Sequence, residues 1–165
     1  MGKWVWISGL VVVLDQITKV IAVSALLGRP PVVVIPELFD FSLVYNSGAA
    51  FGFLSGAGGW QNMFFVVVAA VVSIVIVAML RRLEPSERQS ALAFALILGG
   101  ALGNLIDRIR FGYVIDFVHW FYRDWHWPHF NVADSAITVG VVLLLLDAFG
   151  LRVFGRRTSA DNKHP

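Results

Sequence analysis

The sequence predicts an all-α polytopic membrane protein with four transmembrane helices and a small sheet outside the membrane. Its 165 residues are 58% hydrophobic and 15% charged, whereas soluble domains contain about 25% charged residues. Four long apolar stretches are present, and about 20 helical residues cross a hydrocarbon core of about 30 Å. A soluble fold of this length could not bury so much apolar surface.

The four predicted spans cover about residues 4–27, 60–80, 91–110 and 132–151. The third is long enough only if its helix continues past Asp107 and Arg108. The second has Ser73 as its one polar residue between positions 63 and 80, so we expect it to face lipid and to be the span least suited to chemistry.

The first span has an alternative interpretation as a cleavable signal peptide, because Lys3 precedes an apolar run and small residues follow at positions 22–24. A signal peptide would not tolerate the polar residues that interrupt this run, which are Asp15, Gln16, Thr18 and Lys19. We therefore expect a permanent span.

The distribution of cations predicts the orientation, because short loops rich in Lys and Arg stay in the cytoplasm. One side of the membrane receives Lys3, Arg81, Arg82, Arg88, Arg152, Arg156, Arg157 and Lys163. The outer segments, residues 28–59 and 112–131, carry Arg29 and Arg123 as their cations. Both termini are predicted to be cytoplasmic, with one transmembrane domain over residues 1–155 and a disordered cytoplasmic tail over 156–165.

The two outer segments differ in composition. Residues 32–53 mix β-branched and aromatic residues with prolines nearby, which predicts short strands and turns. Residues 114–130 are crowded with Trp, Phe and Tyr, which prefer the interface between headgroups and acyl chains. We expect this second segment to lie along the outer surface.

Several polar residues lie within the predicted spans, where a charge costs at least about 2.5 kcal/mol. Asp15 and Lys19 are one helical turn apart and of opposite sign, as in a structural ion pair. Asn104, Asp107 and Arg108 share one face near the outer end of the third span. Either this trio forms a functional network, or the two charged residues simply end the span.

Two acids are predicted to lie at similar depth near the outer face. Asp116 follows the third span between apolar neighbours, and Asp134 begins the fourth. Partial dehydration would raise the pKa of Asp116. Asp134 could instead be a helix N-cap, so position alone does not decide between a catalytic pair and a structural role.

A zinc site on the second outer segment is an alternative, built from His119, His126 and His129 with Asp116 nearby. Their spacing is irregular and they lie among interfacial aromatic residues. The sequence contains no cysteine, so thiolate ligands are absent. The net charge of +2 gives no indication of nucleic-acid binding.

These polar and glycine-rich segments resemble the lipoprotein signal peptidase family, also called signal peptidase II, over about residues 10–150. The resemblance rests on five segments in the same order: LDQITK at 14–19, YNSGAAFGF at 45–53, GGALGNLIDR at 99–108, VIDF at 114–117 and FNVADSAITVG at 130–140.

The resemblance implies an intramembrane aspartic endopeptidase of the bacterial inner membrane, with a β-cradle outside the bilayer. Such an enzyme removes signal peptides from prolipoproteins by cleaving before a diacylglyceryl-modified cysteine, and two aspartates activate the water. It implies Asp116 and Asp134 as the catalytic pair. The residues implied in substrate binding are Asn46, Gly48, Asn104, Arg108 and Asn131, and those implied in structural support are Asp15, Lys19 and Asp107.

The expected partners are the lipid-modified prolipoprotein and membrane lipids, and the expected state is a monomer without metal or cofactor, with its active site near the outer face. A non-enzymatic alternative is a small transporter or channel. Its charged pathway would use Asp15, Lys19, Asp107 and Arg108.

Overall fold

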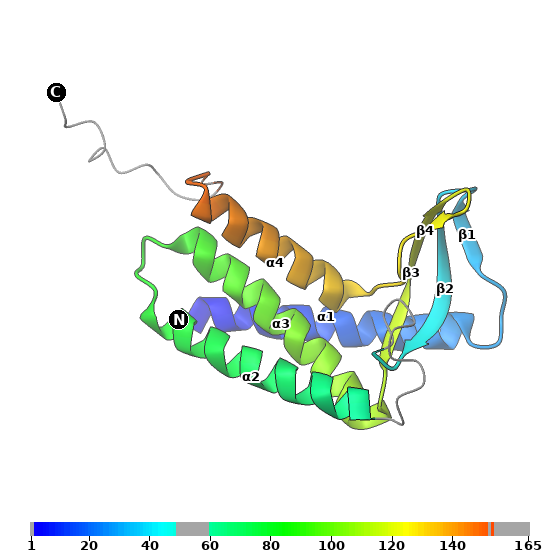
Figure 1. The fold of residues 1–165 in the computed structure, drawn as a ribbon, viewed down its shortest axis with the longest axis horizontal. Helices are drawn as coiled ribbons and strands as arrows, with labels where there is room; N and C mark the ends of the chain where they lie inside the picture. Colours follow the sequence, from blue (N-terminus) through cyan, green and yellow to red (C-terminus); the bar gives the residue numbers. More distant parts are fainter. Residues whose placement is uncertain (1, 49–59, 152, 154–165) are drawn as a thin grey trace.

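The computed structural model describes residues 2–48, 60–151 and 153. Its elements are α1 (Gly2–Leu26), β1 (Val32–Ile35), β2 (Phe39–Asn46), α2 (Trp60–Arg82), α3 (Arg88–Phe111), β3 (Val114–Tyr122), β4 (Trp125–His126) and α4 (Val132–Ala148). The helices extend along the long axis of the molecule, and the sheet lies at one end of them (Figure 1). The predicted tail over residues 156–165 lies outside the described residues.

The described part is a mostly helical membrane protein with a small antiparallel sheet, as the sequence predicts. Three helices, α1, α2 and α3, are long and apolar enough to cross a membrane. The third does continue past Asp107 and Arg108, to Phe111. Helix α4 has 17 residues, a length of about 25 Å.

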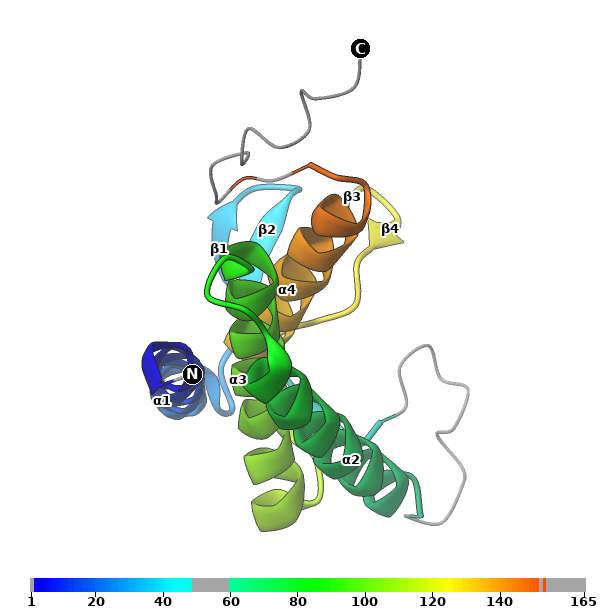
Figure 2. The same cartoon turned by 90° about the vertical axis from the view of Figure 1, so that its left-hand side faces the viewer.

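Helix α3 is the centre of the bundle and packs against each of the other three helices. Figure 2 shows α1 and α2 on different sides of it. Glycines allow this close packing: a Cβ on Gly99 would lie 2.8 Å from the carbonyl oxygen of Ser8, and one on Gly103 would lie 2.6 Å from Oδ2 of Asp15. A Cβ on Gly100 would overlap the carbonyl oxygen of Ala133.

Two apolar clusters hold the elements around the bundle. Between α2 and α3 the buried residues are Ile76, Leu80, Ala91, Phe94 and Leu98. Between α1 and the sheet they are Ala22, Leu26 and Phe117. Most of α2 outside its cluster is exposed, in agreement with the expectation that this helix faces lipid.

The sheet has the order β1-β2-β3-β4, and every neighbouring pair is antiparallel. Strand β2 pairs with β3 so that Val44 lies opposite Asp116 and Asn46 opposite Val114. The sequence predicted strands only in the first outer segment, whereas half of the second segment forms β3. Residues Val114 to Phe117 are all buried, so the alternation of apolar and polar residues that indicates a half-exposed strand is absent there.

Candidate active site

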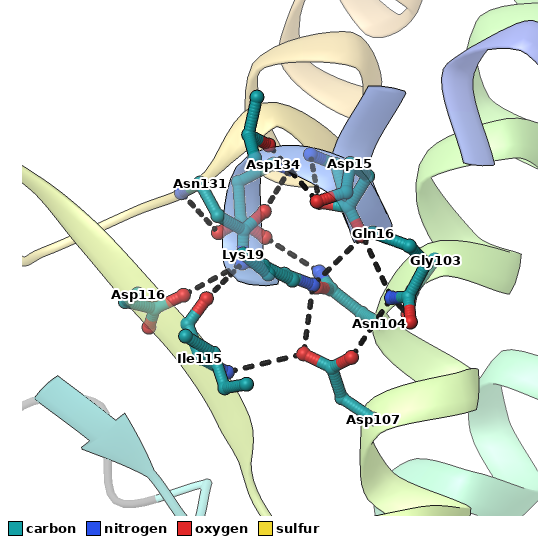
Figure 3. Close-up of polar contacts among 12 residues, drawn as sticks. Asp15, Gln16, Lys19, Gly103, Asn104, Asp107, Ile115, Asp116, Asn131 and Asp134 are labelled. Carbon is teal, nitrogen blue, oxygen red and sulfur yellow. Dashed lines mark hydrogen bonds and ion pairs between the residues drawn. The ribbon is translucent and has the colours of Figure 1, made fainter. Parts of the chain in front are cut away.

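Asp116 and Asp134 lie together where the helices meet the sheet. Asp116 is on β3 and is 1% exposed, and Asp134 is in the first turn of α4. Asn131 joins them: its Nδ2 donates to Asp116 Oδ1 at 2.7 Å, and its Oδ1 accepts from the main-chain N of Asp134 at 2.9 Å (Figure 3). One buried amide therefore sets the relative position of two carboxylates from different elements.

Asp134 is not the N-cap of α4, so that interpretation was wrong. Asn131 is the N-cap, with an extended backbone, and Asp134 is the third helical residue of a capping box. Its Oδ2 accepts from the main-chain N of Asn131 at 3.2 Å, and its Oδ1 accepts from Asn104 Nδ2 at 2.8 Å. The helix start therefore holds the Asp134 side chain in one orientation.

Asn46 holds the other oxygen of Asp116. Its Nδ2 donates to Asp116 Oδ2 at 3.0 Å, and its Oδ1 accepts from the main-chain N of Gly48 at 2.9 Å. Gly48 has a φ of +96°, a conformation that strongly favours glycine. The turn after β2 thus fixes the amide that contacts Asp116.

The environment of Asp116 raises its pKa to about 7, chiefly through burial and next through the negative charge of Asp134. Hydrogen bonds from Asn46 and Asn131 and the charge of Lys19 oppose this increase. Two carboxyl groups that interact in this way titrate as a coupled pair. Near neutral pH the pair can hold one proton between them.

A buried ionic network supports the two acids. Lys19 is 1% exposed, and its Nζ lies 2.9 Å from Asp15 Oδ2, 2.8 Å from Asp107 Oδ2 and 3.0 Å from Asn104 Oδ1 (Figure 3). The predicted Asp15–Lys19 pair is present, and Asp107 extends it to α3. A buried cation with three oxygen partners is satisfied.

The same carboxylates also hold main-chain groups of the two acid-bearing elements. Asp15 Oδ1 accepts from the main-chain N of Ala133 on α4 at 3.0 Å, and Asp107 Oδ2 accepts from that of Ile115 on β3 at 3.1 Å. Ala133 precedes Asp134 and Ile115 precedes Asp116 in the sequence. The network therefore fixes the backbone of each acid from inside the bundle.

Gln16 also belongs to this network, although in the sequence it is notable only as one of the polar residues that interrupt an apolar run. Its Nε2 donates to Asp107 Oδ1 at 2.9 Å, to Asp15 Oδ2 at 3.2 Å and to the carbonyl of Gly103 at 3.3 Å. It follows Asp15 directly on α1.

Arg108 borders the acids from α3. Its guanidinium carbon lies 5.0 Å from the ring centroid of Phe65 on α2, within electrostatic range of Asp134, Asp116 and Asp107. Asn62 Nδ2 donates to its main-chain oxygen at 3.2 Å. Its buried Nε has no hydrogen-bond partner within residues 2–48, 60–151 and 153.

The three histidines of the zinc alternative contact one another and residues of β2. The ring of His119 stacks on His129, with centroids 4.2 Å apart, and its Nε2 lies 3.0 Å from His126 Nδ1. Its Nδ1 is 3.3 Å from Asp40. Asp116 contacts amides instead, and no set of three or more His, Cys, Asp or Glu in the described part of the chain is arranged to hold a metal ion.

Comparison with known proteins shows close relatives over most of the chain. The family described as Signal peptidase (SPase) II matches residues 7–150. The lipoprotein signal peptidase of Pseudomonas aeruginosa (strain UCBPP-PA14) is 53% identical over 148 residues, which is 88% of this chain and 87% of the relative. That of Acinetobacter baumannii (strain ATCC 17978) is 54% identical over 148 residues, covering 90% and 84%.

Two solved structures, each described as a bacterial membrane enzyme, have the same fold. One has a TM-score of 0.77 at 33% identity, covering 90% of this chain and 93% of that chain. The other has a TM-score of 0.72 at 31% identity, covering 95% and 96%.

Proposed function

We propose that Asp116 and Asp134 are the catalytic pair of this chain, which belongs to the signal peptidase II family and is a membrane aspartic peptidase that removes signal peptides from prolipoproteins. The observation that carries the proposal is the Asn131 side chain, which hydrogen-bonds Asp116 and caps the helix turn that presents Asp134. The family leaves the transporter or channel alternative without support.

In this mechanism the two acids share one proton. The ionised member takes a proton from water as the water attacks the scissile carbonyl, and the protonated member hydrogen-bonds the developing oxyanion. Proton return to the leaving amine completes the cleavage. The raised pKa of Asp116 supports this division near neutral pH.

The substrate binding site that we propose surrounds the pair. Gly48 and Arg108 border it from the turn after β2 and from α3 and would hold the substrate backbone by hydrogen bonds, which are stronger where water is excluded. Asn46, Asn104 and Asn131 also orient the acids, since each donates to one of the carboxylates. Asp15, Lys19 and Asp107 form the structural support beneath them.

The position of the site suits cleavage before a diacylglyceryl-modified cysteine. Such a substrate keeps its signal helix and acyl chains in the bilayer, so its scissile bond lies at the membrane interface. We place the acids at that depth because Asp116 is on β3 and Asp134 is in the first turn of α4, and these two elements meet where the helices end and the sheet begins (Figure 1). Bilayer lipids then flank the site.

The membrane arrangement in this proposal has α4, extended to residue 151, as the fourth span of a monomer with one transmembrane domain over residues 1–155. Lys3 and the α2–α3 hairpin with Arg81, Arg82 and Arg88 lie at the end of the bundle away from the sheet (Figure 1). By the positive-inside rule that end is cytoplasmic, which puts the sheet and the active site at the outer face of the inner membrane, and both termini inside.

The test is cleavage of a lipid-modified precursor by purified protein. Asp116→Asn and Asp134→Asn should each lower the rate at least about 100-fold, the scale of general acid–base catalysis, without changing membrane insertion. Asp124→Asn, an exposed acid in the β3–β4 turn, is the matched control and should cleave normally. Full activity in either variant of the pair would refute the proposal.

Treatment with a chelator distinguishes the aspartate pair from the alternative of a zinc site. We expect the wild-type rate to be unchanged by EDTA. Loss of activity with EDTA and recovery with zinc would instead support a catalytic zinc site at His119, His126 and His129.

A further inference from the structure

Helix α2 was expected to face lipid and to be the span least suited to chemistry, yet its first two turns contact the candidate site. The ring of Phe65 lies against Gly48, since a Cβ built on that glycine would be 2.5 Å from Cε2 and 2.7 Å from Cδ2 of the ring. The same ring lies under the Arg108 guanidinium, 5.0 Å from centroid to carbon. Because Gly48 has no side chain, the Phe65 ring can occupy this space and contact Arg108.

The described residues leave one nitrogen of the Arg108 guanidinium without a hydrogen bond. Among the described residues its buried Nε has no hydrogen-bond partner, and the buried Oδ1 of Asn62 has none either. Asn62 Nδ2 donates to the main-chain oxygen of Arg108 and not to its side chain. Within the described part of the chain, the aromatic face of Phe65 therefore orients the charged group of this arginine together with the negative charges of the nearby acids.

From this geometry we propose that Phe65 is a positioning residue of the substrate site, which acts by holding the Arg108 guanidinium in place for the substrate backbone. The inference rests on the substrate-binding role proposed above for Arg108. An aromatic face attracts a guanidinium, and an arginine that is already ordered loses less conformational freedom when substrate binds. Preordering of Arg108 therefore improves substrate binding, which KM reports, more than it speeds the chemical step, which kcat reports.

Steady-state cleavage of a lipid-modified precursor in detergent micelles tests the proposal. Phe65→Leu should raise KM about three- to tenfold and leave kcat within about twofold, as expected for loss of one partly buried cation–π contact. Phe65→Tyr keeps the aromatic face and should have wild-type KM. Phe149→Leu, at a side chain that is 79% exposed, is the matched control and should change neither constant.

Combination with Arg108→Gln shows whether Phe65 acts through the arginine. Phe65→Leu should raise KM no further in the Arg108→Gln background, because the two changes remove the same interaction. An equal further rise would overturn the proposal, as would impaired binding by Phe65→Tyr or a drop in kcat alone. Normal kinetics of Arg108→Gln would refute the proposed role of Arg108, whereas impaired Arg108→Gln with normal Phe65→Leu would refute this inference alone.

Discussion

Asp116 accepts two hydrogen bonds and still holds its proton near neutral pH. Two amide donors from different elements, Asn46 and Asn131, contact its oxygens. Such bonds favour the charged form. Burial and the nearby charge of Asp134 have the larger effect and raise its pKa to about 7.

The raised pKa of Asp116 predicts that activity falls on the basic side of the pH profile. As the pH rises through about 7, Asp116 loses its proton and the proton-sharing form of the pair disappears. We therefore expect kcat/KM to fall about tenfold per pH unit well above that value. Precursor cleavage measured between about pH 5.5 and 9 would show this limb, and a flat profile up to pH 9 would contradict it.

Some of the site could be predicted from single residues, and some could not. Asp116 and Asp134 were noticed because a charge beside apolar spans needs a function or a partner, and the resemblance of their segments to a known family implied the catalytic role. The N-cap of α4 was misplaced by three residues, because Asn and Asp are both common at this position and the sequence offers one of each. Gln16 as a donor to Asp107 depends on a contact between segments far apart in the chain. Spacing along one helix does not reveal such partners.

At the scale of whole elements, Lys19 connects α1 to α3 from inside the bundle. Its replacement by Met leaves the Asp15 and Asp107 carboxylates buried without their cation. Removing one partner of a buried ionic group typically costs about 3–5 kcal/mol, so we expect Lys19→Met to lower the unfolding temperature strongly and to lose cleavage. Thermal unfolding in detergent measures this.

Lys3→Met is the matched control for that change. Lys3 is exposed near the start of α1, where its Nζ lies 5.0 Å from the ring centroid of Trp4. This variant should unfold like the wild type. Similar unfolding temperatures for Lys19→Met and the wild type would mean that the network does not stabilise the bundle.

The close packing of α3 against α4 gives a second prediction. A Cβ on Gly100 would overlap the carbonyl oxygen of Ala133, so Gly100→Ala must push α4 away at a cost of about 1–3 kcal/mol. Gly9→Ala on α1 meets no atom within 4 Å and should leave the unfolding temperature unchanged or slightly higher. Equal unfolding temperatures for the two variants would contradict the packing argument.

The helices were more predictable than the strands. An apolar run of about 20 residues indicates a span regardless of what surrounds it, and the predicted limits of α2 and α4 lie close to those in the structure. Strand β3 was missed because Val114 to Phe117 are buried on both faces and pair with β2, a segment about 70 residues earlier. The contacts of Phe65 on α2 likewise depend on tertiary packing.

For the whole molecule, the central position of α3 explains why the site lies at one end. Helices α1 and α4 and strand β3 all meet the C-terminal turns of α3, where Asn104 and Asp107 contact the other elements. The ionic network therefore contacts both elements that carry the acids, β3 with Asp116 and α4 with Asp134. The opposite end of the bundle holds the α2–α3 connection with Arg81, Arg82 and Arg88.

This separation of the two ends makes the membrane orientation testable. The chain has no cysteine, so single cysteines can be introduced as labels without background. Asp124→Cys, in the exposed β3–β4 turn, and Ser86→Cys, in the exposed α2–α3 connection, lie at opposite ends of the bundle. We expect a membrane-impermeant maleimide to label the first in intact spheroplasts and the second only after lysis, because short loops rich in Arg stay in the cytoplasm. Labelling in the reverse order would invert the proposed topology and place the acids at the cytoplasmic interface, where a prolipoprotein already inserted with its lipid-modified cysteine outside could not reach them.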